Sequence, residues 1–172
     1  FQMIKKTTQE NPNRILSAYK DNVAFSQGPK IELFAPADHS QPDFYQVKEV
    51  ESVISLKAET HNFPTTVEPF NGASTGSGGE IRDRMGGGVG SMPIAGTAVY
   101  MTSYPRLQGD AISAEHDASL KEWEKILPVR EWLYQTPEQI LIKASNGASD
   151  FGNKFGQPLI CGSVLTFEHN EQ

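Results

Sequence analysis

The stretch from Lys57 to Asp83, KAETHNFPTTVEPFNGASTGSGGEIRD, constrains this chain more than any other. It begins in a predicted strand, Val53–Glu59, whose β-branched and apolar residues suit a half-buried sheet. Side chains two positions apart share one side of an extended chain, so Glu59 and His61 are predicted to face the same space. Pro64 disfavours helix at the residue before it and predicts an irregular loop, the kind of segment in which binding and catalytic groups concentrate.

A run of small residues, Gly72–Gly79, comes next and predicts an anion-binding loop. Small side chains let a ligand approach the backbone, and consecutive amides form a concavity for anions when a helix begins directly afterwards. Glu80–Asp83 is the predicted helix start. Asp83 suits magnesium, which prefers one or two carboxylates with phosphate oxygens and water, and Arg82 offers a bidentate fork to phosphate or carboxylate. The stretch as a whole predicts a phosphate site.

Plainer interpretations of the same residues stay open. A Gly/Ser-rich run is also typical of a flexible loop. The two generic glycine motifs do not fit, because no lysine follows the glycines and Ile81 stands where the last glycine of a dinucleotide fingerprint belongs. The carboxylates of Glu80 and Asp83 also suit a helix-start cap, favoured by the helix dipole without a metal. His61 is also explained as a buried histidine that orients the loop.

Charge and hydropathy narrow the classes of partner. The 172 residues carry a net charge of −6 at pH 7, and no apolar run is long enough to span a membrane. An acidic chain without clustered Lys and Arg argues against a broad nucleic-acid surface. No signal peptide is recognised at residues 1–6. We therefore expect a soluble, cytoplasmic protein that binds neither nucleic acid nor membrane. Cys161, the single cysteine, is expected to be a small core residue rather than a nucleophile.

Strands alternate with a few helices along the chain, which predicts an α+β fold resembling an α/β sandwich, with a mixed sheet covered by helices on one face. One domain is predicted over residues 1–172. Thr136 and Gln139 form a capping box that begins a helix, and Gly156 is its predicted terminator. The other predicted elements are a helical entry over Phe1–Asp21, strands over Ile31–Phe34, Ile94–Tyr104 and Leu159–Phe167, and a surface helix over Gln108–Lys125.

The Lys57–Asp83 stretch resembles the signature of the formylglycinamide ribonucleotide amidotransferases, also called phosphoribosylformylglycinamidine synthases, in their long single-chain form. FQMIKKTTQENPNRILSAYKDNVAF resembles the family's segment leading into SAYKDN, and ASNGASDFGNKFGQPLICG resembles a later glycine/asparagine segment. Tyr104–Leu133 has no clear counterpart. The resemblance implies an ATP-dependent ligase of purine biosynthesis, which converts formylglycinamide ribonucleotide, glutamine and ATP to formylglycinamidine ribonucleotide.

The resemblance also implies a fold and a set of partners. It suggests the N-terminal half of the ATP- and substrate-binding region, a domain similar to that of aminoimidazole ribonucleotide synthetase. The chain is then expected to be a fragment of the synthetase region that is inactive in isolation. Its expected partners are the remaining domains of the enzyme, including the glutaminase domain. Such domains pair through their sheets, so a sheet-mediated dimer of the fragment is a further expectation.

Site residues follow from the resemblance position by position. His61 matches the family's catalytic histidine, as a general base or as a group that stabilises the phosphorylated intermediate. Glu59 and Asp83 match magnesium ligands, and Lys57 matches a lysine that contacts ATP. ATP and Mg²⁺ are therefore the expected cofactors. The substrate-contacting positions are Thr60, His61, Asn62, Phe63 and Arg82. The nucleotide-binding positions besides Lys57 are Gly72, Ala73, Ser74, Thr75, Gly76, Ser77, Gly78, Gly79, Glu80, Ile81, Arg82 and Asp83.

Phe63 departs from a common form of the family signature, in which a second histidine precedes the proline. His61 must then perform the imidazole chemistry alone. Two alternatives to a catalytic domain stay open. One is a non-catalytic structural or nucleotide-sensing half-domain, because long members contain two such domains. The other is a different ATP-dependent enzyme of the superfamily, such as a selenophosphate synthetase or thiamine-phosphate kinase, which should lack ETHNFP together with ASNGASDFGNKFG.

Overall fold

The computed structural model describes residues 1–38, 40–88, 91–105, 122 and 134–169. It divides into two compact units, one made of Phe1–Ala58 with Asp83–Ser91 and the other of Glu59–Arg82 with Met92–Gln172. The predicted surface helix over Gln108–Lys125 lies outside the described residues apart from Glu122. The single domain over residues 1–172 stays a prediction.

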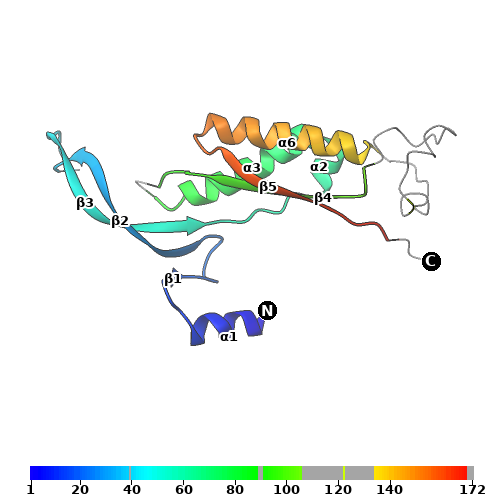
Figure 1. Ribbon diagram of the computed structural model, residues 1–172. Helices are drawn as coiled ribbons and strands as arrows, with labels where there is room; N and C mark the ends of the chain where they lie inside the picture. The colour runs from blue at the N-terminus through cyan, green and yellow to red at the C-terminus, as the bar shows by residue number, and fades with distance from the viewer. Residues whose placement is uncertain (39, 89–90, 106–121, 123–133, 170–172) are drawn as a thin grey trace. The chain divides into compact units, whose positions relative to one another are not determined.

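The first unit is built on a three-stranded antiparallel sheet with the order β1–β2–β3. Its elements are helix α1 (Gln2–Glu10) and strands β1 (Ile15–Ser17), β2 (Ala24–Pro36) and β3 (Tyr45–Leu56). β2 and β3 run side by side as one long ribbon, paired from Ala24 opposite Leu56 to Pro36 opposite Tyr45 (Figure 1). The predicted strand over Ile31–Phe34 is thus the middle of a much longer strand, because backbone pairing with β3 continues beyond the apolar run.

The ladder between β2 and β3 is interrupted once, between Gln27 and Lys30. Gly28 lies at this irregularity, where a Cβ would overlap the Ser52 hydroxyl of β3. The Ser52 hydroxyl donates a hydrogen bond to the carbonyl of Pro29. A side chain at position 28 would therefore displace the Ser52 hydroxyl from its hydrogen bond with Pro29 and press on the Ser52 backbone, which glycine avoids.

The predicted helical entry over Phe1–Asp21 is wrong beyond Glu10. α1 ends there, Asn13 has a positive φ of 46°, and Ile15–Ser17 pairs with β2 as a strand. Pro12 lacks the amide hydrogen that a continuing helix needs. The apolar spacing of Ile15, Leu16 and Tyr19 suggested one helical face, but pairing with β2 determines the conformation of this segment.

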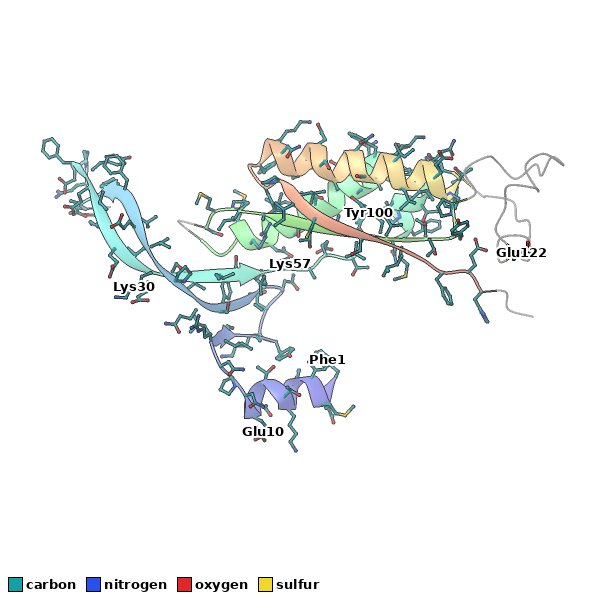
Figure 2. All side chains as sticks on the ribbon, in the orientation of Figure 1. Phe1, Glu10, Lys30, Lys57, Tyr100 and Glu122 are labelled. Atoms are coloured by element: carbon teal, nitrogen blue, oxygen red, sulfur yellow. The ribbon has the colours of Figure 1, made fainter. Side chains whose placement is uncertain are left out.

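The second unit places helices on one face of a parallel pair of strands, β4 (Gly96–Thr102) and β5 (Leu159–Thr166). Helices α3 (Pro69–Met85) and α6 (Pro137–Lys154) contribute Ala73, Ala144 and Ala148 to a buried cluster. Tyr100 of β4 and Leu159 of β5 pack against this cluster, and Figure 2 shows Tyr100 between its strand and the helices. Small side chains therefore form the cluster between these two helices, where they allow the helices to pack closely.

Gly147 of α6 lies directly against the backbone of α3. A Cβ at this position would lie 2.0 Å from the carbonyl oxygen of Phe70 in α3. No side chain fits in that space, so the glycine sets the distance between α6 and α3.

The predicted boundaries of α6 are confirmed. Thr136 caps the helix by accepting from the Gln139 amide, while the Gln139 side chain accepts from the Thr136 amide. Pro137 occupies the first turn. The helix ends at Lys154, and Gly156 has a φ of +71°, the left-handed conformation that glycine adopts without strain after a helix.

The α+β prediction is confirmed for the described residues, which form four helices, one antiparallel sheet and one parallel pair of strands. The described strands form two separate sheets and not the single mixed sheet that was predicted.

The strand predicted over Ile94–Tyr104 is confirmed as β4. Cys161 lies in the predicted strand over Leu159–Phe167, but it is exposed and so is not the core residue that was predicted.

Candidate functional site

His61 lies in the segment that connects Glu59 to a short helix, α2 (Phe63–Val67). Asn62 caps α2 by accepting a hydrogen bond of 2.8 Å from the Phe63 amide. The irregular loop predicted at Pro64 is therefore wrong over these five residues. Proline is tolerated in the first turn of a helix, where an amide hydrogen has no partner within the helix.

Thr65 holds the imidazole of His61. Its hydroxyl lies 2.9 Å from the carbonyl oxygen of His61 and 3.2 Å from the ring atom Nδ1. Both side chains are half-buried. The ring is thus fixed by a contact from the following turn of helix, and Nε2 takes no part in this pair of contacts.

The glycine-rich run is helical, which corrects the predicted anion-binding loop. Gly72–Gly79 lies wholly inside α3, and the Gly72 amide donates to the carbonyl of Glu68 at 2.7 Å. Amides inside a helix are used by carbonyls one turn back, so they form no concavity for an anion. A nucleotide contact by these residues must therefore use the helix surface.

Glu80–Asp83 is likewise near the end of α3 and not at its start. The interpretation of Glu80 and Asp83 as a helix-start cap is wrong for the same reason, since the dipole disfavours carboxylates at this end. Glu80 instead accepts a hydrogen bond from the side chain of Gln157, which is fully buried. Glu80 therefore joins α3 to the start of β5.

One face of α3 is a platform for the segment that carries the predicted site. A Cβ at Gly72 would lie 2.6 Å from Cα of Thr65, and a Cβ at Gly76 would lie 3.0 Å from Cβ of His61. A Cβ at Gly79 would lie 3.6 Å from the carboxyl carbon of Glu59. Residues three and four apart share a helix face. The glycines thus place Glu59, His61 and Thr65 in a row along α3.

Arg82 folds back along the same helix. Its guanidinium lies 2.8 Å from where a Cβ of Gly78 would be, beside the ring of Phe151 in α6, and 3.8 Å from a Cβ of Gly79. Arg82 and Glu59 therefore reach the surface of α3 at the same glycine, Gly79. Arg82 and Glu59 are both exposed, as are Thr60, Asn62 and Phe63.

A cavity of about 530 Å³ opens beside His61 in this unit. Three of the predicted substrate positions, His61, Asn62 and Phe63, line it. Phe63 and Tyr134 form one aromatic wall with their rings edge to face at 6.1 Å. Other lining residues are Thr65, Thr66, Val99, Tyr100, Met101, Thr102, Ser103, Gln135, Pro137, Ile140 and Phe167. No Asp, Glu, Lys or Arg is among these lining residues.

Tyr100 adds a neutral phenol to the cavity wall. Burial raises the pKa of Tyr100 above its ordinary value of 10.0, while the Ser145 side chain on α6 acts in the opposite direction. The phenol of Tyr100 therefore stays protonated at neutral pH.

Lys57 and Asp83 form an ion pair in the first unit. Lys57, labelled in Figure 2, follows β3, and its ammonium lies 2.9 Å from the carboxylate of Asp83. The Lys57 side chain is only 9% exposed and that of Asp83 is 34% exposed. Lys57, predicted to contact ATP, and Asp83, predicted to bind magnesium, are therefore paired with each other. The other predicted metal ligand, Glu59, belongs to the second unit.

Among the described residues, no group of three or more His, Cys, Asp and Glu is placed to hold a metal ion. No helix in the described ranges is long and apolar enough to cross a membrane.

Comparison with curated proteins shows which enzyme this chain is similar to. Over 171 residues it is 39% identical to phosphoribosylformylglycinamidine synthase from Dictyostelium discoideum, which covers 97% of this chain. It is also 39% identical over 161 residues to the synthase of the same name from Drosophila melanogaster, which covers 93% of this chain. This chain is a fragment-sized relative of phosphoribosylformylglycinamidine synthase. The resemblance drawn from the sequence motifs is thereby confirmed. No protein-family model matches the chain.

The chain spans about an eighth of the length of these synthases, 12% of the first and 11% of the second. The relationship to the synthases covers both compact units, since both alignments extend over more than nine tenths of the chain.

Sequence reasoning about the synthase signature missed Thr65, which contacts His61, and the other residues that line the cavity beside it. Thr65 and Thr66 follow ETHNFP directly, but their part in the cavity depends on the short helix α2, which the sequence reasoning had taken for an irregular loop. Tyr134 and Gln135 carried no sequence signal. They reach the cavity from the segment before α6, far away in the sequence.

Proposed function

We propose that this chain carries part of the synthetase region of a phosphoribosylformylglycinamidine synthase, an ATP-dependent ligase of purine biosynthesis. In the proposed reaction the amide oxygen of formylglycinamide ribonucleotide attacks the γ-phosphorus of ATP, and ADP leaves. Ammonia released from glutamine then adds to the activated carbon, and phosphate leaves as the amidine forms. Positioning and charge neutralisation supply most of the rate in phosphoryl transfer.

The observation that carries the proposal is the placement of His61 in the cavity wall next to Asn62 and Phe63. Two of these three residues bring polar groups, and the third brings an aromatic face. The described residues that line the cavity include no Asp, Glu, Lys or Arg, which suits the neutral formylglycinamide end of the substrate. The ribose phosphate then needs a partner elsewhere. Arg82 is the candidate, because it is exposed and offers a planar fork to phosphate.

His61 is proposed to act as the general base that takes a proton from the substrate amide or from the entering ammonia. Its role as a stabiliser of the phosphorylated intermediate needs the protonated ring, so the two roles require different protonation states. Thr60 adds a hydroxyl to the same segment.

Lys57 and Asp83 of the first unit are proposed to serve the nucleotide and its magnesium ion, and Glu59 of the second unit is a separate candidate magnesium ligand. Carboxylates fit magnesium, which takes one or two of them together with phosphate oxygens and water. The Lys57–Asp83 ion pair supports this proposal because it brings a cation that suits phosphate and a carboxylate that suits magnesium within 2.9 Å of each other. The outer surface of Gly72–Asp83 is proposed to lie along the nucleotide.

The fold is proposed to be the N-terminal half of a domain similar to aminoimidazole ribonucleotide synthetase, acting with the remaining domains of a cytoplasmic enzyme, including its glutaminase domain. Exposed apolar residues on the β2–β3 ribbon, such as Phe34 and Val47, support a sheet-mediated dimer or an equivalent pairing inside a longer chain.

An exchange experiment tests the catalytic role. The matching segment of the Dictyostelium synthase is replaced by this chain, and amidine formation is measured. His61→Ala should lower kcat by about 10²- to 10⁴-fold, the range for a lost general acid–base group. His169→Ala is the matched control, because His169 is exposed and absent from the cavity lining. Near-normal turnover in an active chimera carrying His61→Ala would refute the role of His61.

A binding experiment tests the nucleotide role in this chain directly. Calorimetric titration with ATP, with and without magnesium, should show magnesium-dependent binding that Asp83→Asn removes. Binding that persists unchanged in Asp83→Asn would refute the metal role of Asp83. Tight ATP binding by the chain together with an active chimera that tolerates His61→Ala would favour the nucleotide-sensing alternative.

A further inference from the structure

The hydroxyl of Thr65 makes two contacts with one residue. It lies 2.9 Å from the carbonyl oxygen of His61 and 3.2 Å from Nδ1 of the same residue. A hydroxyl has one proton to donate and two lone pairs with which to accept. A carbonyl oxygen can only accept, so the proton of Thr65 goes to the His61 carbonyl.

The contact with Nδ1 must then run in the other direction. With its proton already donated, the Thr65 oxygen accepts, and Nδ1 of His61 has to carry hydrogen. In a neutral imidazole one nitrogen carries hydrogen and the other is the acceptor. Nε2 is therefore the basic atom of neutral His61.

We propose that Thr65 is a positioning residue that holds neutral His61 in the Nδ1–H tautomer and leaves the lone pair of Nε2 as its proton acceptor. This inference rests on the proposed function, in which His61 acts as a base. It assigns that role to one atom and to one supporting hydroxyl.

The glycine platform on α3 makes the arrangement rigid. Thr65 approaches α3 at Gly72 and His61 approaches it at Gly76, with no room for a Cβ at Gly72 and little at Gly76. Each pair is four residues apart, so two consecutive turns of α3 support the two partners. Side chains locked by packing and hydrogen bonds are the ones that keep a reactive atom in place.

Nitrogen NMR of the imidazole rings tests the inference on this chain without any substrate. At a pH where the ring is neutral, protonated and acceptor nitrogens give well-separated signals. We expect Nδ1 of His61 to appear protonated and Nε2 to appear as the acceptor. An Nε2–H tautomer in the unmodified chain would overturn the proposal.

Three variants sharpen the test. Thr65→Val keeps the shape but removes the hydroxyl, and should shift the tautomer ratio of His61 about fivefold toward Nε2–H, equivalent to one hydrogen bond of about 1 kcal/mol. Thr65→Ser should restore the original ratio. Thr66→Val is the matched control, because Thr66 also lines the cavity but makes no hydrogen bond with His61 among the described residues.

An unchanged tautomer ratio in a folded Thr65→Val chain would overturn the proposal, with folding checked by the amide spectrum. If Thr65→Val does not fold, the unmodified chain and Thr65→Ser still decide, since both must show the Nδ1–H form. The proposed function fails separately: an active synthase chimera that tolerates His61→Ala would refute the role of His61 as a base and leave the tautomer result untouched.

Discussion

The β2–β3 ribbon and the α3–α6 helix pair are stabilised by different means. The ribbon is held by a long backbone ladder, while Phe34 (72% exposed) and Val47 (62% exposed) remain open to solvent. The helix pair is held by Ala73, Ala144 and Ala148, and Gly147 brings the helix backbones together. Among the described residues, many large apolar side chains are therefore exposed, while small ones fill much of the contact between the helices because they allow close approach.

The largest effect is expected from truncating a buried side chain of the helix pair. Ile81 is 0% exposed. Ile81→Ala should lower the free energy of unfolding by roughly 2–5 kcal/mol, since it removes apolar contacts and leaves a cavity. Urea unfolding followed by circular dichroism measures the change, and Ile81→Val should cost only about 0.5–1.5 kcal/mol. If Ile81→Ala and Ile81→Val lowered the free energy of unfolding equally, the prediction of a persistent cavity would be wrong, because the surrounding residues would have closed around the missing atoms.

A pair of glycine substitutions tests the platform on α3. Gly79→Ala should raise the free energy of unfolding by about 1 kcal/mol, because alanine favours the helix and its Cβ meets Glu59 at an ordinary 3.6 Å. Gly76→Ala should lack that gain, because its Cβ would lie 3.0 Å from Cβ of His61. Urea unfolding and the imidazole NMR signals of His61 measure both effects. Equal stabilisation by both, with unmoved His61 signals, would contradict the platform.

The capping box of α6 offers a smaller, local effect. Thr136→Ala removes the hydroxyl that accepts from the Gln139 amide at 3.2 Å. It should lower the free energy of unfolding by about 1 kcal/mol, and Thr136→Ser should restore it. Thermal unfolding measures the loss, and amide hydrogen exchange should speed up in the first turn of α6. Exchange that accelerates equally in α1 would mean that the effect is not a lost cap.

The smallest effect is expected on the ribbon. Phe34→Ala should change the free energy of unfolding by less than about 0.5 kcal/mol, because the ring is exposed and contacts mainly Tyr45 at 5.2 Å between centroids. Unfolding is measured at two protein concentrations. A loss above about 2 kcal/mol that grows with concentration would show that this face is buried between copies of the chain, and would support the sheet-mediated dimer.

Features encoded by neighbouring residues were predictable. The start and end of α6 follow from Thr136, Gln139 and Gly156, whose caps involve only residues within a few positions. β4 follows from its own alternation. The relationship to the synthases also followed from motifs such as ETHNFP. A long, specific motif can be recognised from its residues alone, without knowing the conformation that it adopts.

The helical state of Gly72–Gly79 was decided by tertiary structure. By intrinsic preference this run favours a loop, since each glycine costs a helix about 1 kcal/mol relative to alanine. The compensation comes from Thr65 and His61, whose close approach to α3 only glycine allows. A sequence pattern shows that side chains are small, but not which neighbour uses the space.

The sequence by itself therefore determined the resemblance to the synthases, the α+β composition and the boundaries of α6, and it proposed His61 as the candidate reactive residue. Only the tertiary structure decided that the glycines form a packing platform, that Lys57 pairs with Asp83, and that Thr65 orients the imidazole. The physical reason is the separation along the sequence of the residues that interact. Caps and alternation are local interactions, whereas close packing and ion pairs depend on segments that meet only after folding.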